Sequence, residues 1–196
     1  MPRHRLALIL ACVLGLAVTL GLAWNAGVFR SQPPVAVGGP FQLVDQNGAP
    51  ATEKALKGKW SAVFFGFTYC PDVCPGTLQG LAAATDQLGP RAKDFQIVFV
   101  SIDPERDTPQ QLKTYLSAPY VPKSTIGLTG GQEQVQAAAK AYKVYYAKVG
   151  DGADYTMDHS TAIYLMDPKG RFKTVIPYNL PSDEIARRIK DAMREG

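Results

Sequence analysis

Two short runs of apolar, β-favouring residues constrain the fold of this chain more than any other feature. They lie at 61–67 (SAVFFGF) and 95–102 (FQIVFVSI). Continuous apolar runs of this length are typical of strands that are covered on both faces. Between them, leucines and alanines recur at helical spacing over 78–88. The succession of strand, helix and strand predicts an α/β domain around a buried sheet.

Weaker signals on either side complete the predicted order of elements. An Asn-Gly turn at 47–48 follows the short run 41–44, which predicts an N-terminal β-hairpin. The later elements are a helix that opens at Thr108-Pro109, a helix at 132–142, a strand pair at 162–166 and 172–176, and a helix that Ser182 caps. This order is typical of a thioredoxin-like α/β sandwich.

The N-terminal part carries a different signal, because residues 6–24 (LALILACVLGLAVTLGLAW) contain no charge. As a helix this run would span roughly 28 Å, close to the hydrocarbon core of a bilayer. Arg3 and Arg5 precede it, so the positive-inside rule places residues 1–5 in the cytoplasm. We expect one uncleaved transmembrane helix. The alternative is a cleaved signal peptide, whose apolar region is normally about 7–15 residues long.

The rest of the chain divides into a linker and one domain. The stretch 30–40 (RSQPPVAVGGP) is rich in Pro and Gly, and we place the linker at 25–39 and the domain at 40–196. The formal net charge of +4 is small and mixed, which gives no electrostatic reason to expect nucleic acid as a partner. Without an Arg- and Ser-rich transit peptide, the chain fits a bacterial inner membrane, crossed once, with the domain facing the periplasm.

The chemistry concentrates directly after the first buried strand, where Cys70 and Cys74 form a C-x-x-x-C motif. Thioredoxins have C-x-x-C instead. Pro75 suits the first helical position, so we expect Cys74 to be the N-cap, with a thiol pKa lowered by the helix N-terminus. A loop broken by Pro71 can close into a reversible disulfide or open to bridge a metal ion. The alternative is a purely structural disulfide, which would stabilise the fold weakly because its loop is short.

One histidine is available to such a site. His159 directly precedes the predicted strand 162–166, at an edge where a thioredoxin-like fold brings a loop beside its first helix. The other histidine, His4, falls on the side expected to be cytoplasmic. Thiolates with imidazole suit Cu(I), and with a fourth ligand they suit Zn(II) equally. The residues themselves therefore leave the metal open.

Three segments together resemble a known family: FFGFTYCPDVCP (64–75), SIDPERDTP (101–109) and MDHSTAIYLMDPKG (157–170). They are similar to the Sco/SenC family of copper-binding, membrane-anchored, thioredoxin-like proteins. The resemblance implies that Cys70, Cys74 and His159 bind copper. It also implies a part in assembling the binuclear copper site of cytochrome c oxidase. One departure is Met157, because the family usually has valine before the Asp-His pair.

Three further residues are candidates for the surroundings of the site. Met157 offers a soft thioether, although methionine is also a common filler of gaps in a core. Asp158 either orients the imidazole or is a solvated loop carboxylate. Asp103 closes a strand beside the expected cysteine loop, where it either supports the site or caps a turn with Pro104.

Two classes of function fit these residues. The first is a copper carrier that passes its ion to the copper-site subunit of cytochrome c oxidase, or exchanges it with other copper or thiol carriers. The alternative is a thiol–disulfide oxidoreductase that keeps an acceptor's cysteines reduced, or a redox or copper sensor. Thioredoxins have a cis-proline directly before the strand that corresponds to 162–166, and this chain has none there. A peroxiredoxin is disfavoured because position 67 is Phe rather than Thr. We do not expect a classical enzyme.

Overall fold

The computed structural model describes residues 3–25 and 36–195, in two compact units that divide between Val35 and Ala36. The first unit contains helix α1 (Arg3–Asn25). Most of the predicted linker lies outside the described residues, as do residues 1 and 2 of the predicted cytoplasmic end. Within the described part of the chain, no helix combines the length and hydropathy that crossing a membrane requires. The anchor at 6–24 stays a prediction.

The second unit is built on a mixed sheet with the strand order β2-β1-β5-β4-β3-β8-β9. Its centre is the parallel pair β3 (Trp60–Gly66) and β4 (Phe95–Ser101), in which every residue is buried. These are the two apolar runs of the sequence, so the prediction of strands covered on both faces is confirmed. The other strands of this sheet are β1 (Gln42–Asp45), β2 (Pro50–Thr52), β5 (Ile126–Thr129), β8 (Ala162–Met166) and β9 (Phe172–Pro177).

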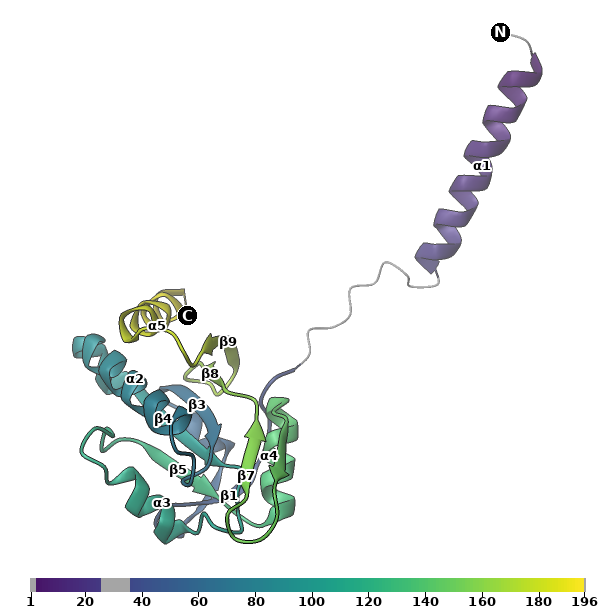
Figure 1. Cartoon of the computed structure of the whole chain (residues 1–196). Coiled ribbons are helices and arrows are strands. Elements are labelled where there is room, and N and C mark those ends of the chain that lie inside the picture. The colour runs from purple at the N-terminus through teal and green to yellow at the C-terminus, as the bar shows by residue number, and fades with distance from the viewer. Residues whose placement is uncertain (1–2, 26–35, 196) are drawn as a thin grey trace. The chain divides into compact units, whose positions relative to one another are not determined.

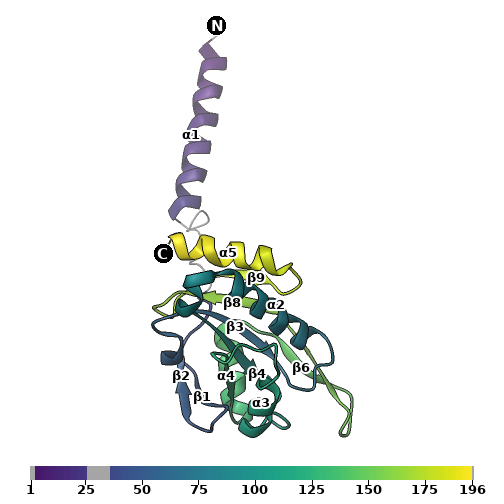
Figure 2. The same cartoon turned by 90° about the vertical axis from the view of Figure 1, so that its left-hand side faces the viewer.

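Helices cover both faces of this sheet, with α2 and α4 on opposite sides in Figure 1. On one face Tyr115 packs against Phe99, and on the other Tyr142 packs against Phe65, with ring centroids 5.6 and 5.3 Å apart. Figure 2 shows α5 lying beside α2. The helices are α2 (Val73–Gln87), α3 (Pro109–Leu116), α4 (Gln132–Tyr142) and α5 (Ser182–Glu195), with short 3-10 turns at Glu53–Leu56 and Gly89–Asp94.

Several predicted local signals are confirmed. β1 and β2 pair antiparallel around Asp45, whose carboxylate accepts hydrogen bonds from the N–H groups of Asn47 and Ala49. Thr108 caps α3 by accepting a hydrogen bond from the N–H of Gln111, and Pro109 stands at the first helical position. Each of these features depends on residues that are close together in the sequence, so the local pattern was enough to predict it.

A second, two-stranded sheet was not predicted from the sequence. It consists of β6 (Tyr146–Val149) and β7 (Thr156–His159), which pair only with each other. Both strands are short and half exposed, so they lack the apolar run that identified β3 and β4. We call residues 146–159 the histidine hairpin, because His159 is its last residue.

Candidate metal centre

The cysteine motif connects the carboxyl end of β3 to the first turn of α2. Helix α2 begins at Val73 with Asp72 as its N-cap, so the prediction that Cys74 is the N-cap is wrong. The N–H of Gly76 donates to the carbonyl of Asp72 (3.0 Å), which starts the helix two residues earlier than expected. Pro75 is still accommodated, because the N–H groups of the first turn have no partner within the helix.

The two thiols differ sharply in burial. Cys74 is fully buried in the core, whereas Cys70 is half-buried. Glycine at position 66, the last residue of β3, makes room for the inner sulfur. A Cβ atom placed there would come within 2.8 Å of Sγ of Cys74 and 3.0 Å of the Phe99 ring. The close approach of α2 to β3 therefore depends on this glycine.

The two thiols also differ in acidity. A hydrogen bond from the Cys74 thiol lowers the pKa of Cys70 to about 5, helped by the N–H groups of Cys74 and Asp72 and by His159, and opposed by burial. The N–H of Cys74 lies 3.3 Å from Sγ of Cys70. The same thiol pairing, together with burial, raises the pKa of Cys74. The predicted lowering at Cys74 is therefore wrong, because the helix N-terminus points at the other sulfur.

His159 is held with one ring nitrogen free. Its Nδ1 lies 2.8 Å from the carbonyl oxygen of Ser160. Because a carbonyl only accepts, Nδ1 carries a proton, so in the neutral imidazole Nε2 is the nitrogen with the lone pair. The ring also meets Phe67 edge-on, with centroids 6.0 Å apart. This is the tautomer and the orientation by which metal-binding histidines are usually prepared.

The fold thus brings the three predicted ligands into one neighbourhood. Phe67 precedes Cys70 on the same loop and contacts His159, and the protonated form of this imidazole would help to lower the Cys70 pKa. The three groups are not closed around a common point. In the part of the chain that the structure describes, no three His, Cys, Asp or Glu side chains are close enough to hold a metal ion.

The three predicted neighbours of the site lie in different settings. Asp103 is buried, and its carboxylate accepts from Arg106 Nε and from the Tyr155 hydroxyl, both at 2.6 Å. Its carbonyl accepts from the N–H groups of Arg106 and Asp107, as the turn alternative predicts. Asp158 is exposed, on the face of β7 opposite to Met157 and His159.

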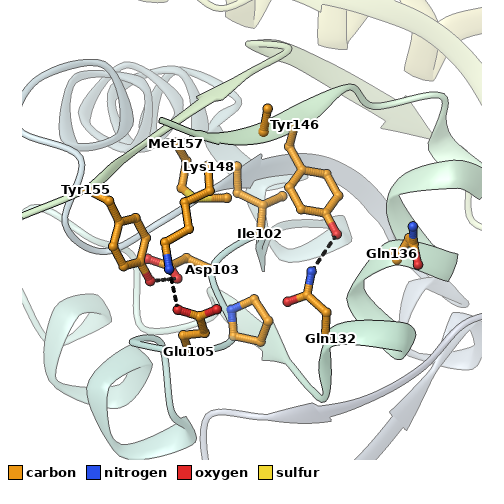
Figure 3. Close-up of a pocket in the computed structure, with 11 residues that line it drawn as sticks. Ile102, Asp103, Glu105, Gln132, Gln136, Tyr146, Lys148, Tyr155 and Met157 are labelled. Atoms are coloured by element: carbon orange, nitrogen blue, oxygen red, sulfur yellow. Dashed lines mark hydrogen bonds and ion pairs between the residues drawn. The ribbon is translucent and has the colours of Figure 1, made fainter. Parts of the chain in front are cut away.

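Met157 is buried and lines a cavity of about 300 Å³ (Figure 3). The cavity lies between the histidine hairpin, the end of β4 and the first turns of α4. An ion pair between Lys148 and Glu105 (2.8 Å) borders it, and Gln132 reaches toward the hydroxyl of Tyr146 (3.5 Å). Its remaining lining residues include Ile102, Asp103, Gln136 and Tyr155.

Sequence reasoning missed Asp107, which fixes the start of the cysteine loop. Its buried carboxylate accepts hydrogen bonds from the N–H and the hydroxyl of Thr68 (3.0 and 2.6 Å) and from Ser101 (2.6 Å). Burial raises its pKa despite these three bonds. The sequence did contain a signal for this residue, namely the segment 101–109 that follows β4. Because β3 and β4 are parallel neighbours, their carboxyl ends meet at one edge of the sheet, where the cysteine loop also begins.

The sandwich and its site define a thioredoxin-like protein that carries a C-x-x-x-C loop beside a single histidine. This chain belongs to the SCO1/SenC family, whose family model matches residues 30–194. Over 162 residues it is 43% identical to the Arabidopsis thaliana protein named SCO1 homolog 1, mitochondrial. That match covers 82% of this chain and 48% of the relative. The chain therefore spans about half the length of that relative.

Solved structures confirm the expected fold class. The crystal structure of Arabidopsis thaliana ScoI with copper bound matches with a TM-score of 0.77 and 42% identity, covering 82% of this chain and all of that one. Copper is thus bound in a close structural relative. A second structure is that of BsSco, described as a member of the Sco family of cytochrome c oxidase assembly proteins that contains a disulfide switch. It matches with a TM-score of 0.65 and 28% identity, over 83% of this chain and 96% of that one.

Proposed function

We propose that this chain is a copper carrier that holds the ion through Cys70, Cys74 and His159. The observation that carries the proposal is the orientation of His159, whose Nδ1 donates to Ser160 and leaves Nε2 free beside the cysteine loop. Cys70, whose pKa is lowered, supplies a thiolate at neutral pH. Cys74 would lose its proton on binding metal, as coordinating thiols do.

The donor set favours copper over zinc. Two thiolates and one imidazole are soft or borderline ligands of the kind that Cu(I) prefers, whereas Zn(II) sites usually have four ligands. The two buried carboxylates near the cysteine loop are already engaged by other side chains. Asp103 binds Arg106 and Tyr155, and Asp107 binds Thr68 and Ser101.

The recipient we propose is the binuclear copper site of cytochrome c oxidase during its assembly. Support comes from the description of BsSco as a member of a family of oxidase assembly proteins. Cys70 is the more accessible thiol, so an acceptor's cysteines would reach the ion from this side. Other copper or thiol carriers would exchange with the same face.

Copper binding by the reduced full-length protein, purified in detergent, tests the proposal. We expect His159→Ala to weaken Cu(I) affinity by at least about 10–100-fold, since the loss of groups that merely orient a ligand already costs that much. His4→Ala removes the only other histidine and is the matched control. Equal affinity of the His159→Ala variant and the control would contradict the ligand set.

A thiol–disulfide oxidoreductase is the second candidate, favoured by the asymmetry of the two thiols. Cys70 has the lowered pKa of an attacking thiolate, and Cys74 is the buried partner. Cells that carry His159→Ala separate the candidates, because dithiol exchange does not need the imidazole. A normal oxidase copper centre in those cells would favour the oxidoreductase.

We also propose that residues 6–24 anchor the chain in a bacterial inner membrane, with the domain in the periplasm. The support is the charge-free run and the two arginines before it. Protease added to spheroplasts should digest the domain. A protected domain, or a mature N-terminus beyond Trp24, would overturn this assignment.

A further inference from the structure

One guanidinium group lies between the cysteine loop and the histidine hairpin. The Cζ atom of Arg106 is 3.6 Å from the ring centre of Tyr155 and 4.6 Å from that of Tyr69. Tyr69 is the residue before Cys70, and Tyr155 directly precedes β7, which ends in His159. Arg106 therefore contacts both segments that carry predicted ligands.

Hydrogen bonds fix this guanidinium in place. Its Nε donates to Asp103 (2.6 Å), and its Nη1 donates to the backbone carbonyl of Tyr155 (2.9 Å). The hydroxyl of Tyr155 donates to the other carboxylate oxygen of Asp103 (2.6 Å), which closes a ring of three residues. The remaining nitrogen, Nη2, is buried and finds no acceptor among the described residues. The guanidinium as a whole stacks on the two aromatic rings.

A second cation extends the stack across the hairpin. The ammonium of Lys148, on β6, lies 3.8 Å from the ring centre of Tyr155 and pairs with Glu105 at 2.8 Å (Figure 3). A series of cation–aromatic contacts thus runs from the cysteine loop to β6 and to the residue before β7, through Tyr69, Arg106, Tyr155 and Lys148. We call these four residues the cation–aromatic ladder.

The hairpin is attached to the domain by its two ends and by side chains, among them the buried Tyr155 and Met157. β6 and β7 form a separate two-stranded sheet that has no ladder of hydrogen bonds to the main sheet. A two-stranded hairpin alone is at best marginally stable in water. The turn at 150–154 is exposed throughout. The position of His159 therefore depends on side-chain contacts, and the ladder is the set that joins the hairpin to the cysteine loop.

We infer that Arg106 is a positioning residue that clamps the histidine hairpin to the cysteine loop. Breaking the ladder would release the hairpin, and His159 would then move away from the sulfurs of Cys70 and Cys74. This would provide a way for a bound ion to lose one ligand while the two cysteines keep it. The inference deepens the proposed function, on which its copper-dependent part rests.

The clamp itself is tested without metal, by amide hydrogen exchange on the reduced full-length protein. In Arg106→Leu we expect exchange in the histidine hairpin to accelerate about tenfold or more, with β3 and β4 unchanged. Arg171→Leu is the matched control, because Arg171 also donates through Nε to an aspartate (Asp167, 2.7 Å) but stacks on no ring in the described structure. Unchanged exchange in the hairpin would overturn the inference.

Copper affinity then tests what the clamp does. We expect Arg106→Leu to weaken Cu(I) binding about tenfold when His159 is present, and to have no further effect in His159→Ala. Equal losses in both backgrounds would mean that Arg106 does not act through His159. Arg106→Lys, which keeps the charge but not the planar stack, should restore affinity only in part.

If Arg106→Leu fails to fold, Tyr69→Leu replaces it. This side chain is 54% exposed, so its loss leaves the core intact. We expect the same accelerated hairpin exchange at a smaller factor, and its absence would again count against the clamp. Failure of the wild type to bind copper would refute the proposed function, whereas the hydrogen-exchange result would still decide the clamp.

Discussion

The cysteine loop and the histidine hairpin hold their residues by different means. Cys74 is fully buried between α2 and the central strand β3, where a single added methyl at Gly66 would collide with it. His159 ends a two-stranded sheet that pairs with nothing else and rests on side-chain contacts. One half of the candidate site is therefore built into the central sheet, and the other is joined to it by side-chain contacts such as those of Met157, Tyr155 and Arg106. If the chain carries copper as proposed, this division would let one ligand leave without disturbing the central sheet.

The largest effect we expect is from oxidation of the cysteine side. A disulfide between Cys70 and Cys74 uses both thiolates, so copper binding should be lost completely and return on reduction. Copper content after gel filtration of oxidised and re-reduced protein measures this. Unchanged loading of the oxidised form would show that the metal does not use these sulfurs.

A pair of glycine substitutions compares the packing of the two regions. Gly66→Ala should lower the free energy of unfolding by about 1–3 kcal/mol, because the new methyl overpacks the space against Cys74. Gly152→Ala, in the exposed turn of the hairpin, meets no atom within 4 Å, so its cost of about 1–2 kcal/mol should come from its φ of +73° alone. Urea unfolding measures both. An unchanged stability of Gly66→Ala would contradict the close packing of Cys74 against β3.

Alkylation at different pH values distinguishes the two thiols. Cys70 should react with iodoacetamide first, with a rate that rises through a midpoint near pH 5, since its pKa is lowered to about 5. Cys74 should stay unmodified in the folded protein, because it is buried and its pKa is raised. Cys74→Ala removes the thiol that stabilises the Cys70 thiolate, so the midpoint should move to higher pH. Mass spectrometry of the alkylated peptides would reveal the reverse order if this assignment is wrong.

The smallest effect is expected from Asp158→Asn, on the hairpin side. This carboxylate is exposed on the opposite face of β7, while the imidazole already has a partner in the carbonyl of Ser160. We therefore expect Cu(I) affinity to change by less than about threefold, well below the 10–100-fold typical of groups that orient a ligand. A loss in that larger range would make Asp158 the group that orients His159.

Most of the central fold could be predicted from the sequence, because its signals are local. The runs that became β3 and β4 are apolar at nearly every position, and the Asn-Gly turn and the Thr-Pro cap each act within a few residues. The hairpin strands β6 and β7 could not be found in this way. β7 alternates between exposed and more buried residues, whereas β6 has two partly buried residues followed by two exposed ones, and four positions are too few for either pattern to stand out.

The candidate site, like the fold, was predictable from the sequence only in part. The sequence by itself determined which residues could carry the chemistry, since only two cysteines follow the first buried strand and only one histidine lies in the domain. The tertiary structure alone decided their roles. Helix α2 begins at Val73, so its N–H groups and the Cys74 thiol converge on Cys70, and the lowered pKa belongs to the outer sulfur. Arg106 and Asp107 became supports of the site only because the parallel pairing of β3 and β4 brings their segment beside the cysteine loop. The pKa of each thiol and the contacts that hold the cysteine loop depend on which groups meet in the folded chain. Spacing along the sequence does not record those meetings.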